Sequence, residues 1–165
     1  MKEVQLTQGY VALVDDEDFE RVSKFSWYAQ VQRFKDKRVR NVYAQKKEKL
    51  LSGARTTKSM HAFIVNNPDL TAEVDHEDHN GLNNQKHNLR KATKADNQHN
   101  TRKRINNTSG YKGAYWNKKD KVWRAMIGIN SKLTHLGSYA TSEQAARAYD
   151  EAALRLFGEF ANTNF

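Results

Sequence analysis

The stretch that decides the fold is DHEDHNGLNNQKHNLRKATKADNQHN, residues 75–100. It brings carboxylates, imidazoles and carboxamides together within a strongly basic chain. Residues 77–87 inside it are polar, contain Gly81 and lack an apolar period, which predicts a long loop. Such a segment can hold a hard cation beside a general base, so the search for a functional site starts here.

Secondary-structure signals flank the loop on both sides. Val74 leads into Asp75 and His76 as the end of a strand, and residues 88–92 predict a second short strand. Thr93 then has the N-cap spacing to an acidic residue three positions later, which predicts a helix over 94–102. The predicted order is therefore strand, loop, strand, helix.

Hydrolysis of a phosphodiester requires a neutralised phosphate, an activated water and a stabilised leaving oxygen. Asp75 is a hard oxygen ligand, and His76 beside it can act as general base. Neighbouring residues on a strand point to opposite faces, so both can serve one site only where the strand ends or bends. Asn97, in the first turns of the predicted helix, can add a carboxamide oxygen. These three residues form the predicted catalytic core.

The segment over residues 61–105 resembles the HNH nuclease family, whose fold is the ββα-metal unit. The residues that carry the resemblance are Val74-Asp75-His76, Gly81-Leu82-Asn83-Asn84, Asn88-Leu89-Arg90, Thr93 and Asn97. The family implies that Asp75 and Asn97 are metal ligands and that His76 is the general base. It also implies that Asn88 ties the loop and orients His76.

Two departures from the family bear on the metal. His79 stands where such sequences often carry Gly, and Asn97 replaces the second His of the family's name. Asn97 is an oxygen ligand, which favours Mg²⁺, with Mn²⁺ as the second choice, over zinc. The chain has no Cys, so we expect no structural zinc site with thiolate ligands. Two alternatives remain: Asp75 merely caps a loop, and His61 is a packed structural histidine.

Charge is distributed unevenly along the 165 residues. Residues 86–124 hold twelve Lys and Arg against two Asp, a net charge of +10 in a chain whose total is +9. Tyr111, Tyr115, Trp116 and Trp123 are interleaved with these cations. A concentrated basic band with aromatic residues is typical of a polyanion binder, and a solvated basic face is the alternative.

Length and hydropathy limit the class of protein. A chain of 165 residues suffices for one ordinary domain or two small ones. No apolar run approaches the roughly 20 residues that a bilayer span needs. The N-terminus lacks the apolar core of a signal peptide. We therefore expect a soluble protein in the cytoplasm that does not bind membranes.

The first part of the chain, residues 1–60, predicts a small β-rich unit. Residues 4–14, divided at Gly9, are interpreted as a hairpin, and the runs 27–31 and 39–44 as two further strands. The acidic cluster Asp15-Asp16-Glu17-Asp18 precedes a short apolar period. We interpret the cluster as a capped helix start, where the helix dipole favours negative charge, rather than as a metal site.

The third part, residues 110–165, follows a polar linker at 106–110. Three β-prone runs precede a capping box at Thr141 and a helix with an Ala stripe that ends before Gly158. We expect a three-stranded antiparallel sheet with one helix packed on it. Together the three parts predict an α+β chain.

This part also resembles a known family. The matching residues are Gly110-Tyr111-Lys112-Gly113, Trp123-Arg124-Ala125, His135-Leu136-Gly137, residues 143–150, Gly158 and Asn164-Phe165. They are similar to the plant ethylene-response-factor DNA-binding domain of the APETALA-two type, which lays its sheet in the DNA major groove. Alternation along the strand then directs Trp123, Ala125 and Ile127 to the helix and Arg124 and Met126 to DNA.

The resemblance assigns a set of exposed sheet residues to DNA contacts. These are Lys112, Tyr115, Asn117, Lys119, Arg124, Leu133 and His135, to which the basic band adds Arg102 and Arg104. Plant domains carry Arg and Trp at many sheet positions where this chain has Tyr115, Asn117, Met126 and Gly128. We therefore expect a different target sequence. Trp116 either stacks on sugar or packs at the sheet edge.

The combined resemblance implies a metal-dependent endonuclease that prefers certain sequences in double-stranded DNA. It is similar to phage-borne or mobile enzymes of the homing type, which act in the cytoplasm of a bacterial or phage-infected cell. One active site per chain implies a monomer that nicks or a homodimer that cuts both strands. The alternative is a DNA-binding regulator whose nuclease unit is inactive.

Overall fold

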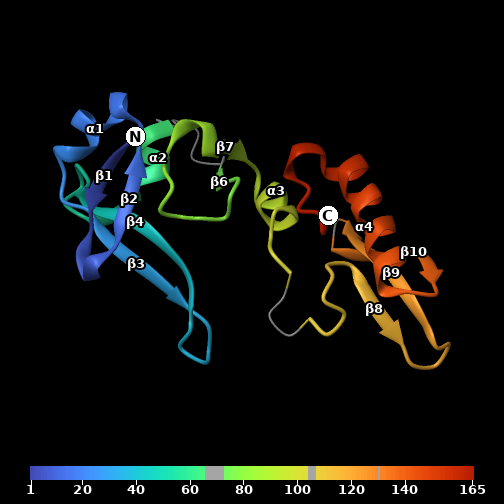
Figure 1. The fold of residues 1–165 in the computed structure, drawn as a ribbon. Helices are drawn as coiled ribbons and strands as arrows, with labels where there is room; N and C mark the ends of the chain where they lie inside the picture. Colours follow the sequence, from blue (N-terminus) through green and yellow to red (C-terminus); the bar gives the residue numbers. More distant parts are fainter. Residues whose placement is uncertain (66–72, 104–106, 130) are drawn as a thin grey trace. The chain divides into compact units, whose positions relative to one another are not determined.

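The computed structural model describes residues 1–65, 73–103, 107–129 and 131–165 (Figure 1). It is a mixed α+β chain whose sheets are antiparallel. The chain divides into two compact units, Met1–Lys94 and Ala95–Phe165. Among the described residues, no helix is long and apolar enough to cross a membrane.

The first unit is rich in short strands. Its elements are β1 (Lys2–Gln5), β2 (Val11–Val14), α1 (Asp16–Ser23), β3 (Tyr28–Arg33), β4 (Val39–Lys49), β5 (Arg55–Ser59), α2 (Met60–Val65), β6 (Glu73–His76) and β7 (Leu89–Ala92). β1 and β2 form a hairpin, β3, β4 and β5 form a three-stranded sheet, and β6 and β7 form a second hairpin. A short 3₁₀ helix at Lys86–Asn88 precedes β7.

One hydrophobic core serves this whole unit. Val14 of β2, Val22 of α1 and Met60 of α2 are completely buried in it, and Leu82 and Leu89 pack against it. The domain boundary predicted at residue 60 does not coincide with an edge of this core, which extends across that position. The reason is that α2 and the loop before β7 supply apolar side chains to a β-rich part too small to bury its own surface.

Two elements of the first unit were absent from the sequence-based prediction. β5 is short and polar, with the sequence RTTKS, so its composition does not predict a strand. The segment is a strand because it pairs with β4. α2 has the sequence MHAFIV, an apolar run too short for its periodicity to distinguish a helix from a strand.

The second unit contains the predicted sheet and helix. Its elements are α3 (Lys94–His99), which starts at the unit boundary, β8 (Ala114–Asn117), β9 (Val122–Ile129), β10 (Lys132–Tyr139), α4 (Ser142–Phe157) and a 3₁₀ helix at Gly158–Phe160. The antiparallel order is β10-β9-β8, and the prediction of three strands followed by a helix is confirmed. α3 ends at His99, three residues before the predicted end.

α4 packs its small residues on the sheet. Thr141 Oγ1 accepts from the Gln144 N–H at 3.2 Å and Gln144 Oε1 accepts from the Thr141 N–H at 3.3 Å, so the predicted capping box is present. Ala145 and Ala146 lie against Ala125 of β9. This packing confirms that the alternate residues of β9 face the helix.

Gly113 permits the closest approach between the sheet and α4. Its φ is +78°, and a Cβ atom at this position would lie 2.0 Å from the Tyr149 ring. Neither the backbone conformation nor the space accommodates a side chain. Tyr149 is buried here, and burial raises its pKa to about 12.

We expect Gly113→Ala to destabilise the second unit by about 2–4 kcal/mol, because left-handed backbone strain and overpacking both act. Urea unfolding followed by tryptophan fluorescence measures the loss. Gly128→Ala is the matched control, since Gly128 lies on β9 with open space at its Cβ position. Equal stability of the two variants would contradict this account of the sheet–helix contact.

Candidate functional site

His76 ends β6 and is buried in the first unit, where Tyr43, His61 and Asn84 surround it; these four side chains are named here the His76 cluster. Its ring packs edge-on against His61, with ring centroids 4.9 Å apart. Tyr43 of β4 flanks both imidazoles, with centroid distances of 5.9 Å to His76 and 6.0 Å to His61. The side-chain oxygen of Asn84 lies 3.4 Å from His76 Nε2. One imidazole thus has neighbours from three other parts of the unit. These are the start of α2, the central strand β4 and the loop before β7.

Asn84 determines which nitrogen of His76 carries the proton. The fully buried Asn84 side chain donates from Nδ2 to the Leu82 carbonyl at 3.1 Å, which leaves its Oδ1 as the acceptor facing His76. His76 Nε2 must then donate, and the neutral ring has Nδ1 as its proton acceptor.

Burial keeps both imidazoles neutral near pH 7. It lowers the pKa of His76 and outweighs the opposing contact with Asn84 and the opposing charges of Asp78 and Asp75. Burial, followed by the neighbouring His76, lowers the pKa of His61 to about 3. A neutral His76 has the protonation state that a general base needs.

Asn88 ties the loop that supplies Asn84 to this cluster. Its Oδ1 accepts from the Asp78 N–H at 3.0 Å, and its Nδ2 donates to Asp78 Oδ1 at 3.0 Å and to the Asn83 carbonyl at 2.8 Å. Asp78 also accepts from the Asn80 N–H at 2.7 Å. Burial raises the pKa of Asp78, but hydrogen bonds from the Asn83 side chain, the Asn80 N–H and the Asn88 side chain, together with the nearby His76, lower it below its ordinary value. The loop is therefore a hydrogen-bonded structure centred on one carboxylate.

Asp75 is held by an arginine across the β6–β7 hairpin. Its Oδ2 accepts from Arg90 Nε at 2.9 Å and from an Arg90 terminal nitrogen at 2.8 Å. Asp75 is opposite Arg90 in the register, and His76 is opposite Leu89. Strand alternation therefore directs Asp75 and His76 to opposite faces of the hairpin. The charge of Asp75 still acts on His76, whose pKa it raises.

Asn97 lies on α3 in the second unit, whereas Asp75, His76 and Asn88 lie in the first. The convergence of Asn97 with the other residues therefore stays a prediction. Within the described residues, no group of three or more His, Asp and Glu side chains is arranged to hold a metal ion.

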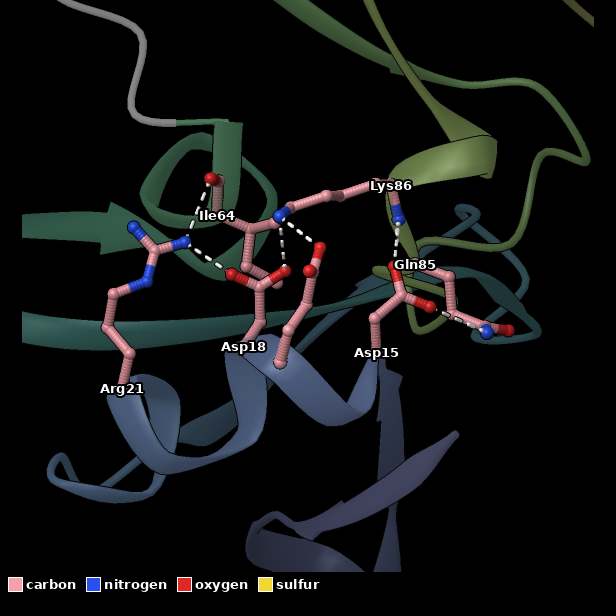
Figure 2. A network of polar contacts seen from close by, with 7 residues as sticks. Asp15, Asp18, Arg21, Ile64, Gln85 and Lys86 are labelled. Carbon is pink, nitrogen blue, oxygen red and sulfur yellow. Dashed lines mark hydrogen bonds and ion pairs between the residues drawn. The ribbon is translucent and has the colours of Figure 1, made fainter.

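The acidic cluster before α1 binds the loop rather than capping the helix. α1 begins at Asp16 with three acidic residues in its first turn, as expected, but the Asp15 side chain makes no capping hydrogen bond. It accepts instead from the Lys86 N–H at 2.8 Å and from Gln85 Nε2 at 3.1 Å (Figure 2). The Lys86 N–H holds the pKa of the Asp15 carboxyl below its usual range.

Further contacts join α1 to the loop and to α2. Lys86 Nζ pairs with Glu17 and lies 3.4 Å from Asp18 Oδ2. Arg21 donates to Asp18 at 2.6 Å and to the Ile64 carbonyl at 3.0 Å (Figure 2). Arg21 therefore links α1 to α2, while Asp18, which is 3% exposed, holds Arg21 and faces Lys86 of the loop.

In the second unit, one face of the sheet carries most of the predicted DNA-contacting residues. Tyr115 is opposite Arg124 and Asn117 is opposite Val122, so these side chains share the face directed away from α4. His135 is opposite Met126 on the same face. Leu133, opposite Gly128, is also exposed there. Arg124 pairs with Asp120 in the β8–β9 turn, where Lys119 is exposed.

Lys112 does not lie on the sheet face that the resemblance assigned to it. It precedes β8, and its Nζ donates to the His99 and Thr101 carbonyls at 2.8 Å each. Burial lowers its pKa to about 8, although Asp150 opposes this change. Asn164 accepts from the Lys112 N–H at 2.6 Å and donates to the Lys112 carbonyl at 3.0 Å. The backbone of Lys112 thus joins the chain end to the sheet.

The remaining predicted residues have varied surroundings. Arg102 is exposed and follows α3, while Arg104 and the first linker residue, Asn106, lie outside the described residues. Trp116 packs at the sheet edge against Trp123, with ring centroids 5.4 Å apart, which favours the second of its two interpretations.

Sequence reasoning missed three contributors to the His76 cluster. Tyr43 is too distant in sequence for any spacing rule to place it there. Asn84 belonged to the quoted motif, but its role depends on burial, which the motif does not reveal. His61 was interpreted as structural, and its Nε2 does lie 2.9 Å from Ser59 Oγ; its contact with His76 was not foreseen.

Known proteins match both parts of the chain. The AP2 domain model matches residues 109–159, which implies DNA binding. The "uncharacterized HNH endonuclease L560" of Acanthamoeba polyphaga mimivirus is 38% identical over 55% of this chain and 46% of its own length. "Protein 3.8" of Escherichia phage T7 is 35% identical over 53% of this chain and 72% of its own. No solved structure matches.

Plant proteins match a shorter region. The "AP2-like ethylene-responsive transcription factor At1g16060" of Arabidopsis thaliana is 44% identical over 34% of this chain and 17% of its own length. This chain thus spans about half of the mimivirus relative, at 46%, and a small part of the plant one. The chain combines an HNH-like part with an AP2-type part. It belongs to the family of protein 3.8 of phage T7.

We expect Asp15→Ala to loosen the loop without unfolding the unit. The hydrogen bond from Lys86 N–H to a charged carboxylate is worth about 1.5–3 kcal/mol, so the Lys86 amide should exchange about tenfold faster or more. Hydrogen exchange followed by NMR measures this. Asp16→Ala is the control, because Asp16 is exposed and pairs with the N-terminal amine. Identical Lys86 protection in both variants would refute the attachment.

Lys112 gives a pH prediction. Its pKa of about 8 lies below the ordinary 10.5, so between these values the unfolded chain holds a proton that the folded chain has lost. Stability relative to Lys112→Met should therefore rise with pH across this window. Urea unfolding at several pH values tests the sign, and NMR titration of the lysine Cε resonances locates the midpoint. A midpoint near 10.5 would disprove the burial argument.

Proposed function

We propose that this protein is a metal-dependent DNA endonuclease with sequence preference, of the phage-borne or mobile homing type. One observation carries the proposal: the buried His76 ends β6, with Asn84 Oδ1 3.4 Å from its Nε2 and with its loop tied by Asn88. This arrangement belongs to a chain with an AP2 domain and an HNH endonuclease relative.

His76 is the proposed general base. A water molecule beside Nδ1 loses its proton to the ring and attacks the scissile phosphorus. Asn84 keeps Nε2 protonated, and Asn88 maintains the loop that supplies Asn84. Burial of His76, beside the edge-on ring of His61, favours the uncharged form of His76 in the resting protein.

The donor set suits a hard cation. Asp75 and Asn97 would hold it through a carboxylate and a carboxamide oxygen, a chemistry that fits Mg²⁺ or Mn²⁺. Mg²⁺ sites commonly use one or two carboxylates completed by water and substrate phosphates, so few protein ligands suffice. When bound, the ion neutralises the phosphate and stabilises the leaving oxygen. Arg90 orients the Asp75 carboxylate through its two hydrogen bonds.

The second unit supplies DNA recognition in this proposal. The sheet face with Tyr115, Arg124 and His135 lies against base edges and phosphates of double-stranded DNA, while Asn117 and Lys119 contact the backbone. A small nuclease unit contacts few bases, so a separate module is needed for affinity and register. Because each chain has one site, a monomer would nick one strand and a homodimer would cleave both strands.

A DNA-binding regulator with an inactive nuclease unit is the second candidate. The Asp75–Arg90 ion pair favours it, because a guanidinium occupies a carboxylate that the metal would need. Incubation of supercoiled plasmid with the protein and Mg²⁺, with and without a chelator, separates the two functions. An absence of cutting at every metal concentration would favour the regulator.

We expect His76→Ala to lower plasmid cleavage by about 10²–10⁴-fold, the usual contribution of a general base, while DNA affinity stays unchanged. Gel quantification and fluorescence anisotropy measure the two quantities. His87→Ala is the control, since His87 is an exposed residue of the same loop. Loss of cleavage and affinity together in His76→Ala would mean that the residue is structural.

A further inference from the structure

The β3–β4–β5 sheet of the first unit has a second face directed away from the core. Val42 and Ala44 of β4 are buried, so Gln45, Lys47 and Lys49 alternate to the opposite face. In the register, these three residues are opposite Ser59, Thr57 and Arg55 of β5, respectively. Opposed residues share a face, so all six lie on one surface.

This surface is continuous with the His76 cluster. Tyr43 is two residues before Gln45 on the same face of β4, and its ring flanks His76 and His61. Ser59, at the end of β5, contacts His61 at 2.9 Å. The two strands therefore lead away from the His76 cluster with one face in common.

Positive charge and exposure coincide on this face. Lys47, Lys49, Arg55 and Thr57 are exposed, and none of the residues that the structure describes on this face of β3, β4 and β5 is a carboxylate. Glu48 points to the other face, where it pairs with the buried Lys46 at 2.7 Å. The charges of this face are therefore not neutralised by acidic residues on it.

We propose that Gln45, Lys47, Lys49, Arg55 and Thr57, named here the β4–β5 basic face, bind the phosphate backbone of double-stranded DNA beside the bond presented to His76. This inference rests on the proposed nuclease function for the position of that bond. Lys and Arg neutralise phosphates, and Gln and Thr donate hydrogen bonds to phosphate oxygens. The face thereby sets the register of the duplex relative to His76.

Distance along the strand predicts where the contacts lie. At about 3.3 Å per residue, Lys47 and Lys49 are about 13 and 20 Å from Tyr43. A duplex advances by about 3.4 Å per base pair, so the contacts should be about four to six base pairs from the scissile bond. An acidic protein segment would also bind cations, but the continuity of the face with the His76 cluster, through Tyr43 and Ser59, favours the nuclease substrate.

Removing the three cations tests the proposal in the full-length chain. We expect Lys47→Gln/Lys49→Gln/Arg55→Gln to reduce the slope of log affinity against log salt by about 2.7, at about 0.9 per lost phosphate contact. Fluorescence anisotropy with a labelled duplex of mixed sequence measures the slope. The control, Lys2→Gln/Lys24→Gln/Lys35→Gln, removes three exposed charges from elsewhere in the first unit and should keep the wild-type slope. Equal slopes in the two variants would overturn the proposal.

A second measurement does not depend on cleavage by the protein. The chain has no Cys, so Thr57→Cys creates a single thiol for a tethered iron chelate that generates hydroxyl radicals. We expect the tether at 57 to cut bound duplex DNA at a discrete position. The same tether at Glu20→Cys, on the exposed acidic side of α1, should leave only background scission. Background scission from both positions would refute contact at this face.

The two proposals can fail separately. Discrete scission from position 57 without any metal-dependent cleavage would refute the nuclease function and leave this DNA-binding face supported. Metal-dependent cleavage with unchanged salt slopes and only background scission would support the nuclease and refute the face. Circular dichroism of each variant confirms that the compared proteins are folded.

Discussion

The attachment of the loop at residues 77–87 to α1 and β2 is the constraint on which the candidate site depends. Leu13 donates to the Leu82 carbonyl and accepts from the Asn84 N–H, both at 2.8 Å, so the loop lies beside β2 as a short parallel bridge. Asp15 holds the loop one step further on, through the backbone of Lys86. Asn84 thereby reaches His76 from a fixed backbone, which a free loop of this composition could not provide.

Burial of His76 follows from the same attachment. Gly81 lies so close to β4 that a Cβ atom would be 2.5 Å from the Val42 carbonyl and 2.6 Å from the Tyr43 ring. The loop therefore closes over the side of β4 that carries Tyr43. Exclusion of water lowers the pKa of the two imidazoles, so their neutral form is favoured by burial as well as by ring chemistry. The β-rich N-terminal part is in this sense a component of the site.

The sequence predicted the second unit better than the first because its signals are local. Strand alternation in β9 and the Thr141 capping box depend on residues close together in the chain. The Asp15 side chain depends instead on a distant residue. The sequence predicts its place at the start of a helix, but its hydrogen-bond partner is about seventy residues away. Lys112 shows the limit of a resemblance, because alignment supplies a position while burial and two carbonyl acceptors determine the direction of its side chain.

The net charge summed over long segments of the chain does not reveal the basic face of β4 and β5. Outside residues 86–124 the chain is nearly neutral, but residues 33–58 carry a net charge of +8. The segments 1–32, 59–85 and 125–165 are net negative and cancel it. The strand register shows that Lys47, Lys49 and Arg55 share one face. The acidic residues that offset their charge in the net charge of the chain lie elsewhere. A surface field depends on the face that charges share, and the two basic regions therefore carry independent information about how this chain engages a polyanion.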